Sequence, residues 1–195
     1  MVKRYYRYYG GLLKSQEKWL NIMAMKGFRL KRVGKLLYEF EQCSPEQYEY
    51  RIEFIGQKSS SDSSSYRSFL EDIGYTVFCK NVNLNYSLGK VRYRPWAEKG
   101  ARISTNTTTF NREILIVEKK HDGKPFNLHT SYEDQIAYYG LLRNPWLFIF
   151  LPLLVLFVFN MTYFNGVLAI LPLFPIAMYQ TQIYHVKKKL KIKEW

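Results

Sequence analysis

The chain has 195 residues and is strongly basic, with 29 Lys and Arg against 16 Asp and Glu and a formal net charge of +13. Two cysteines, Cys43 and Cys79, are too few for a disulfide framework. The charge suits nucleic-acid binding, but an anionic membrane surface also explains it, since each juxtamembrane Lys or Arg gains about 1 kcal/mol there.

The first elements expected are a strand and a helix. Residues 3–9 read KRYYRYY, a basic and aromatic run that predicts an edge strand or an interfacial anchor. Such residues can also grip a nucleic acid, but no recognised binding motif accompanies them. Ser15 is the predicted N-cap of a helix that ends before Gly27. One face holds Trp19, Ile22, Met23 and Lys26, so the apolar stripe of the helix is short. We expect the helix to pack on a sheet.

Three strands are expected next. Residues 28–33 and 36–40 alternate in polarity on either side of Gly34 and Lys35, which predicts a hairpin. After a turn at Ser44 and Pro45, residues 47–55 give the strongest strand pattern in the chain. We expect helices to cover one face of this sheet and water to meet the other.

A loop, a second helix and another strand follow. Residues 56–65 are serine-rich and predict a flexible loop. A helix is expected from Tyr66 to Ile73, stopped by Gly74, and then a strand over residues 75–79. The inward residues of this helix are predicted to be Tyr66, Phe69, Leu70 and Ile73. This order of elements predicts an α+β domain with helices on one face of a small antiparallel sheet, ferredoxin-like or related if residues 3–9 supply the first strand.

Several short motifs, taken in their order along the chain, resemble those of a known protein family. They are Glu17-Lys18-Trp19-Leu20, Met23-Ala24, Lys26-Gly27-Phe28, Tyr38-Glu39-Phe40-Glu41, Tyr48-Glu49-Tyr50-Arg51-Ile52, Leu70-Glu71-Asp72-Ile73-Gly74-Tyr75 and Leu128-His129-Thr130-Ser131-Tyr132-Glu133. With them, most of residues 3–143 resembles the bacterial domain-of-unknown-function family 2812. The resemblance implies a small cytoplasmic α+β domain with C-terminal membrane spans, often encoded beside PadR-like transcriptional regulators. It supplies no activity and no catalytic residue.

The chain departs from the family pattern between about residues 80 and 111, a segment that we interpret as a basic insertion. A loop resting on lipid headgroups is the favoured interpretation, and binding of a phosphate-bearing ligand or a protein partner is the alternative. The candidate contacts are Lys90, Arg92, Tyr93, Arg94, Trp96, Lys99 and Arg102.

A strand and a helix are expected to lead towards the C-terminus. Residues 112–119 predict a strand, followed by a turn at Asp122 and Gly123. Thr130 and Glu133 form a predicted capping box for a helix that runs to Leu142. Its inner face is predicted to hold Tyr132, Ile136 and Tyr139. We expect Asn144-Pro145 to interrupt this helix at a membrane surface.

Residues 144–186 contain no Lys, Arg, Asp or Glu. A membrane helix needs about 20 apolar residues, so this run predicts a transmembrane hairpin with two spans. The spans are expected over about 146–159, extended into 160–163, and 167–184, with the turn within 160–166. Pro152, Pro172 and Pro175 are expected to be tolerated inside them.

The flanking residues predict the orientation of the hairpin. Arg143 and Trp146 lie at its start, and Lys187, Lys188 and Lys189 follow it. Because cytoplasmic flanks collect Lys and Arg, both ends are expected to face the cytoplasm at the cell membrane. The predicted organisation is therefore a domain over residues 1–143, a hairpin over 144–186 and a basic tail over 187–195.

No catalytic or metal-binding motif is found in the sequence. The three histidines are scattered, and neither Glu49 with Glu53 nor Glu71 with Asp72 has the geometry of an acid-base pair. We therefore expect no cofactor and no enzymatic activity. The favoured hypothesis is a membrane-tethered regulatory or sensing protein whose cytoplasmic domain binds a protein partner. The alternatives are an accessory subunit of a membrane transport complex and a module that binds phospholipid or nucleic acid.

Overall fold

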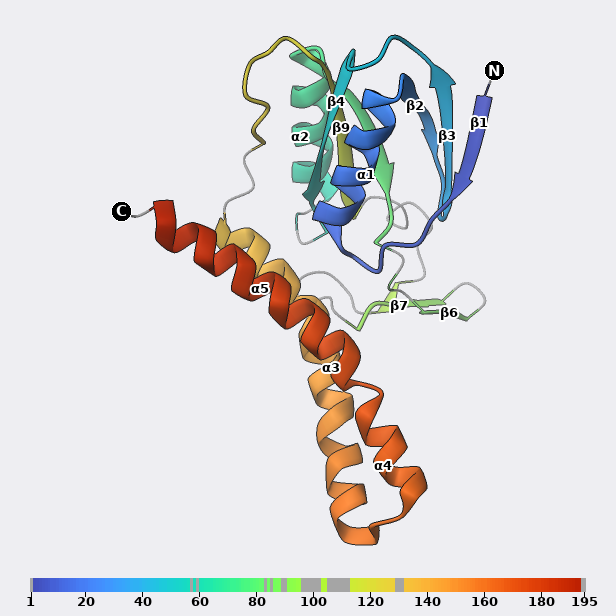
Figure 1. Cartoon of the computed structure of the whole chain (residues 1–195), viewed down its shortest axis with the longest axis vertical. Helices are drawn as coiled ribbons and strands as arrows, with labels where there is room; N and C mark the ends of the chain where they lie inside the picture. Colours follow the sequence, from blue (N-terminus) through green and yellow to red (C-terminus); the bar gives the residue numbers. More distant parts are fainter. Residues whose placement is uncertain are drawn as a thin grey trace. The chain divides into compact units, whose positions relative to one another are not determined.

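The computed structural model describes residues 2–56, 58, 60–82, 84, 86–88, 91–95, 103–104, 113–128 and 132–193. The chain forms two compact units, Met1–His129 and Thr130–Trp195 (Figure 1). The first unit contains β1 (Val2–Tyr6), α1 (Leu13–Met25), β2 (Phe28–Val33), β3 (Leu37–Gln42), β4 (Tyr48–Phe54), α2 (Ser60–Asp72), β5 (Thr76–Lys80), β6 (Tyr86–Leu88), β7 (Val91–Tyr93), β8 (Ile103–Ser104) and β9 (Ile114–Lys120). The second unit contains α3 (Tyr132–Asn160), α4 (Tyr163–Ile170) and α5 (Leu173–Lys193).

The α+β prediction is confirmed, with several small antiparallel sheets in place of one. The first sheet has the order β1-β3-β2, so residues 3–9 do supply its first strand and the predicted hairpin is present. The hairpin turn is closed by the Gly34 N–H, which donates to the Leu37 carbonyl at 2.8 Å. Trp19 of α1 packs edge-on against Tyr38 and Phe40 of β3, with ring centroids 5.0 and 5.4 Å apart. An aromatic layer thus joins α1 to this sheet.

The start of α1 differs from the prediction. The helix begins at Leu13, and its N-cap position is Leu12, which makes no side-chain cap hydrogen bond, so Ser15 is not the cap. The predicted stop at Gly27 is confirmed, since its φ is +77° and a Cβ there would lie 2.9 Å from the Cys43 carbonyl oxygen. The buried side of the helix holds Leu13, Gln16, Glu17, Trp19, Leu20, Met23 and Ala24, without the predicted Ile22 and Lys26.

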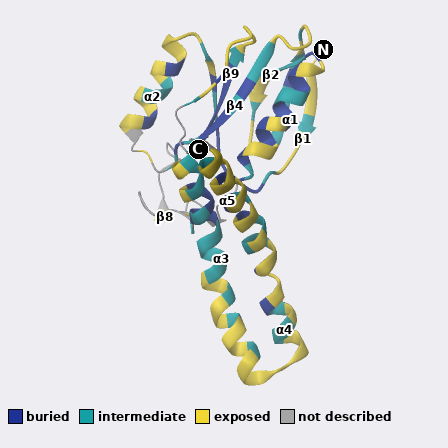
Figure 2. Cartoon of the chain, turned by 60° about the vertical axis from the view of Figure 1, so that its left-hand side comes forward, coloured by how far each residue is buried: buried dark blue, intermediate teal, exposed yellow. Residues whose placement is uncertain are grey.

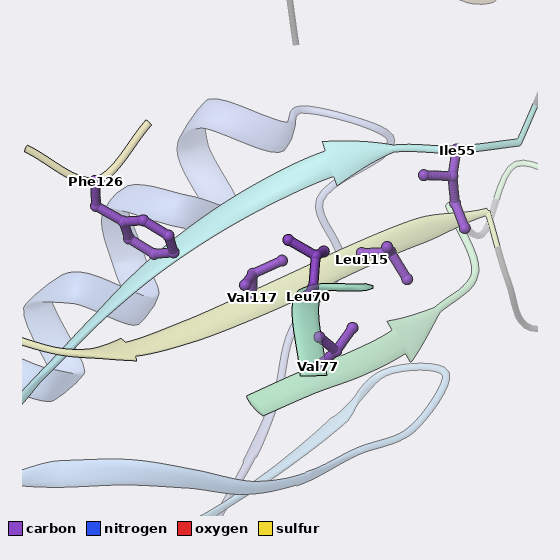
Figure 3. Close-up of a cluster of buried hydrophobic side chains, with 6 residues drawn as sticks. All are labelled: Ile55, Leu70, Val77, Leu115, Val117 and Phe126. Atoms are coloured by element: carbon purple, nitrogen blue, oxygen red, sulfur yellow. The ribbon is translucent and has the colours of Figure 1, made fainter. Parts of the chain in front are cut away.

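In the second sheet, β4-β9-β5, the central strand β9 is buried on both faces, so the expectation that one face meets water is wrong for this strand. In the first sheet, β3 alternates buried and less buried residues as expected. Alternate residues of β9 point to opposite sides of the sheet. Leu115 and Val117 join a cluster with Leu70 of α2, whose members are Ile55, Leu70, Val77, Leu115, Val117 and Phe126 (Figure 3). On the same side, Glu53 is buried and accepts a hydrogen bond of 2.6 Å from the Tyr66 hydroxyl. Of the polar residues of β4, Glu53 therefore faces α2, while Arg51 donates hydrogen bonds to Glu17 and to the Phe126 carbonyl.

The serine-rich segment is not wholly a loop, because α2 begins at Ser60. Serine favours caps and turns over helix interiors, which explains the prediction. Leu70 docks on the sheet and anchors this helix, whereas Phe69 and Ile73 are exposed and not inward as predicted. The predicted stop is confirmed, since Gly74 has a φ of +91°.

In the second unit, α3 runs without interruption through Asn144, Pro145 and Pro152, so the predicted break at residues 144–145 is wrong. The turn of the hairpin is also shorter than predicted. It consists of Met161, with a φ of +41°, and Thr162, whose hydroxyl accepts a hydrogen bond from the Asn165 N–H and caps α4. Leu171 and Pro172 separate α4 from α5, and α5 continues helically through most of the predicted tail. Thr130 of the predicted capping box lies outside the described residues.

Candidate functional site

Most of the candidate contacts in the basic insertion fall outside the described residues. These are Lys90, Trp96, Lys99 and Arg102, while Arg92 is described only by its backbone in β7. Tyr93 is exposed and Arg94 is half-buried. Strand β7 pairs with β6 and β8 in a small antiparallel sheet. The assignment of this segment to lipid or partner contact stays a prediction.

The second unit presents a large apolar surface. Two helical stretches, Tyr132–Asn160 and Tyr163–Ile192, are long and apolar enough to cross a membrane, with mean hydropathies of 2.0 and 1.4. Only 11% and 22% of their most apolar windows are buried, and in Figure 2 exposed positions dominate the part of α3 nearest the turn. Phe148, Phe159 and Phe174 are 76%, 82% and 78% exposed. Soluble proteins rarely leave an apolar surface of this size exposed, so a membrane or another protein is expected to cover it.

The polar end of the hairpin joins its two legs. Arg143 on α3 donates from one guanidinium nitrogen to the Gln180 side-chain oxygen on α5 at 2.7 Å, and from the other to Asn144 at 2.9 Å. Trp146 is half-buried one helical turn further on. Gln180 was not singled out from the sequence, although the polar run at residues 180–182 marks the same level. Beyond it, the predicted flanking residues Lys187, Lys188 and Lys189 are all exposed on α5.

A buried polar network joins β2, β4 and β9 in the first unit. The Glu118 carboxylate accepts hydrogen bonds from Arg29 Nε at 2.9 Å and from the Tyr50 hydroxyl at 2.7 Å. The Tyr50 hydroxyl also accepts one from the Leu30 N–H at 2.8 Å. Hydrogen bonding to Glu118 raises the pKa of Arg29, and burial raises that of Tyr50. Since each of these polar groups has its partner, the network serves the fold and leaves no position for a ligand.

A small basic pocket lies beside the first turns of α1. Its walls come from the segment after β1, the start of α1, β3, and the chain around the ends of β5 and β9. The free space is about 10 Å³, enough for about one water molecule. Arg7 and Lys80 contribute charge, and the lining contains neither Asp nor Glu. The Arg7 guanidinium also lies over the Trp19 ring, 4.9 Å from its centroid. The pocket is therefore cationic.

Lys80 is the more deeply buried of the two cations, with 4% of its surface exposed. Its ammonium donates to the carbonyl oxygens of Gly34 and Lys35, at 3.1 and 2.5 Å, and lies 5.4 Å from the centre of the Tyr38 ring. It forms no ion pair with any carboxylate of the described residues. Burial lowers the pKa of Lys80 to about 8 because the charged form loses its hydration.

Three buried polar atoms around the pocket make no well-aligned hydrogen bond within the described part of the chain. They are the hydroxyls of Tyr9 and Tyr38 and the amide nitrogen of Gln16, although the Arg7 side chain lies close to the Tyr9 hydroxyl and Gln16 lies close to that of Tyr38. Gln16 and Tyr38 are 2% and 0% exposed. Burial raises the pKa of Tyr9 to about 12, against a smaller opposing effect of Arg7, and raises that of Tyr38 further. Sequence reasoning missed this pocket because its residues lie between positions 7 and 114 and share no motif.

Comparison with known proteins gives a family and no close relative. Residues 13–151 match the family described as "Protein of unknown function (DUF2812)". The match begins at the first residue of α1 and ends within α3, so it covers nearly all of the first unit and enters the apolar hairpin. No curated protein and no solved structure matches the chain. Because the matched region is well over half of the sequence, the chain belongs to the DUF2812 family of proteins of unknown function.

Proposed function

We propose that the protein is a membrane-tethered, non-enzymatic regulatory or sensing protein. The hairpin of α3, α4 and α5 is its anchor in the cell membrane, and the α+β unit is a cytoplasmic module that binds a protein partner. The observation that supports the anchor best is the exposed, uncharged surface of the hairpin between Arg143 and Lys187.

The lengths of the two legs suit a bilayer. The helix rises about 1.5 Å per residue, so the uncharged part of α3, residues 144–160, extends about 25 Å. Residues 163–180 of the second leg are of similar length, and a hydrocarbon core is about 30 Å thick. Arg143 and Gln180, which are hydrogen-bonded to each other, would then lie together at one boundary of the core.

The charges of the hairpin support a cytoplasmic location for both ends. Lys187, Lys188 and Lys189 are exposed on α5 beyond the level of Arg143, and the tip at Met161 and Thr162 carries no charge. Lys and Arg gather on the cytoplasmic side of membrane helices. The α+β unit precedes α3 in the chain and would share that side.

One edge of the first sheet has the composition of a partner surface. Tyr6 and Tyr8 are exposed at the end of β1, and Leu36 is exposed on the turn before β3. The two segments are adjacent, since the Arg7 N–H donates to the Leu36 carbonyl at 2.9 Å. Tyrosine and arginine are enriched at protein interfaces. We name Tyr6, Tyr8 and Leu36 the β1 patch.

Cysteine labelling tests the anchor and its orientation. In a chain with Cys43 and Cys79 replaced by serine, Met161→Cys and Lys188→Cys each provide one exposed thiol. In intact cells, a membrane-impermeant maleimide is expected to label Met161→Cys and to reach Lys188→Cys only after lysis. Labelling of Lys188→Cys in intact cells would contradict the orientation, and release of the protein by alkaline carbonate would contradict the anchor.

Photo-crosslinking tests the partner. A photoreactive amino acid at Tyr6 or Tyr8 is expected to capture a protein in native membranes, and the same group at the exposed Phe69 on α2 is the matched control. Capture of a transcriptional regulator supports the regulatory role. Capture of a polytopic membrane protein favours the accessory-subunit alternative, and products with lipid alone contradict partner binding by the β1 patch.

A further inference from the structure

The basic pocket beside α1 contains cationic side chains but no carboxylate among its lining residues. Lys80, Arg7 and the two tyrosine hydroxyls come from three separate segments and line one space. We propose that this pocket binds an oxyanion, a phosphate or a phosphate monoester, with Arg7 and Lys80 supplying positive charge and Tyr9, Tyr38 and Gln16 supplying hydrogen bonds. The inference does not depend on the proposed membrane anchor.

The charge of the pocket favours an anion over a neutral ligand. A buried cation is costly unless it is paired, and Lys80 has carbonyl partners but no carboxylate among the described residues. An anion within reach of its ammonium would favour the charged form and raise again the pKa that burial has lowered. The buried Glu113 accepts a hydrogen bond from the Val82 N–H, and its own N–H donates to the Lys80 carbonyl at 3.1 Å.

The start of α1 adds to the preference for an anion. Leu13 and Gln16 of its first turns line the pocket, Leu12 provides no side-chain cap, and the first turn contains no acidic residue. Helix N-termini carry partial positive charge and attract anions. The two buried side chains whose polar atoms make no well-aligned hydrogen bond, Gln16 and Tyr38, lie close to each other here and distinguish this end from an ordinary uncapped helix.

The size of the pocket limits how the ligand enters. Its free space accommodates one water molecule or one oxygen atom. One oxygen of a phosphate would therefore occupy the interior, and the others would meet Arg7, which is exposed at the surface. A water molecule alone would satisfy the hydroxyls and leave the charge of Lys80 uncompensated.

Thermal unfolding of the full-length protein in phosphatidylcholine nanodiscs tests the proposal. Three samples are compared at constant ionic strength: without addition, with inorganic phosphate, and with phosphatidic acid in the nanodisc. Saturating phosphate, at about 100 times its dissociation constant, is expected to raise the midpoint of the α+β unit by roughly 5 to 10 °C. Stabilisation by phosphate identifies a free oxyanion as the ligand, and stabilisation by phosphatidic acid alone identifies a lipid headgroup.

Substitutions separate this pocket from general charge effects. Tyr38→Phe and Tyr9→Phe remove one hydroxyl each and keep the ring, and each is expected to weaken binding about 10-fold or more. Arg7→Gln is expected to do the same. Arg4→Gln is the matched control, because it removes the same charge from β1 outside the pocket. Lys80 is left intact, since it also holds the β2–β3 turn.

The proposal is overturned if neither phosphate source stabilises the protein, which would leave a structural water as the occupant. It is also overturned if stabilisation is equal in Arg7→Gln, Tyr38→Phe and Arg4→Gln, because binding would then be non-specific. Without ligand, Tyr38→Phe is expected to unfold at the same temperature as the natural chain or higher, since it removes an unpaired buried hydroxyl. A folded Tyr38→Phe protein therefore remains available for the comparison.

Discussion

Asn21 takes the place of a neighbouring strand for Tyr50. The Asn21 side chain donates to the Tyr50 carbonyl oxygen at 2.9 Å and accepts from the Tyr50 N–H at 2.9 Å. Beside it, the Glu17 carboxylate accepts a hydrogen bond from the Ile52 N–H at 3.0 Å. Helix α1 thus satisfies the open edge of β4 with side chains, and an edge strand covered in this way is protected from pairing with another chain.

Asn21→Ala removes both hydrogen bonds to Tyr50 and is expected to lower the free energy of unfolding by about 1 to 3 kcal/mol, because two backbone groups lose their partners. Urea denaturation followed by circular dichroism measures the change. Lys18→Ala, on the exposed side of the same helix, is the control and is expected to stay within about 0.5 kcal/mol of the natural chain. Equal losses in the two variants would contradict a role for Asn21 at this edge.

Glu118→Gln tests the network on the other side of Tyr50. The substitution removes the buried charge that Arg29 contacts at 2.8 Å and leaves only its longer, more exposed ion pair with Glu41 at 3.8 Å. It is expected to cost about 2 to 3 kcal/mol, towards the low end for a buried pair because Arg29 is partly exposed. Arg4→Ala breaks the exposed pair with Glu39 and is expected to cost at most about 1 kcal/mol. A larger loss of unfolding free energy in Arg4→Ala than in Glu118→Gln would contradict the greater contribution of the buried network to stability.

Lys80 predicts a rise of stability with pH. Its pKa is about 8 in the folded protein and about 10.5 in the unfolded chain, so the unfolded state binds the proton more tightly. The free energy of unfolding is therefore lowered in full below pH 8, and this loss disappears as the pH rises towards 10. Equilibrium unfolding at pH 7, 8, 9 and 10 without phosphate measures it, and Lys80→Met is expected to flatten the profile. An unchanged slope in that variant would assign the effect to other groups.

Two glycines of the hairpin are expected to respond oppositely to alanine. At Gly140 a Cβ would meet nothing within 4 Å, so Gly140→Ala should stabilise α3 by about 0.5 to 1 kcal/mol through helix propensity. At Gly166 a Cβ would lie 3.1 Å from the Phe157 ring, so Gly166→Ala should gain less or destabilise, and Gly166→Val should destabilise. Thermal unfolding in detergent measures both. Equal gains at the two sites would contradict close packing of α4 on α3.

Local sequence patterns were enough to predict the elements whose cause is local. The β2–β3 hairpin follows from alternation around Gly34, and the ends of α1 and α2 follow from Gly27 and Gly74. The uncharged run from residue 144 to 186 likewise predicted the paired apolar helices. Each of these signals is contained within a few turns or strand residues.

The features that were missed depend on contacts between distant residues. Nothing near Ser60 indicates a helix, because α2 is fixed by the docking of Leu70 on β5 and β9. The polar face of β4 was expected in water because its partners, such as Tyr66 and the chain at Phe126, lie on other elements. The basic pocket needs five segments to come together, so no window of the sequence contains it.

The tip of the hairpin has a consequence for how the membrane anchor that we propose would be assembled. Two uncharged residues, Met161 and Thr162, join legs whose backbone is already hydrogen-bonded within helices. Moving a charged residue to the centre of a bilayer costs about 2.5 to 3.5 kcal/mol even at the insertion machinery. A hairpin without charges and without an extended loop avoids that barrier. It can be inserted from the side on which it is synthesised, with the two legs entering together.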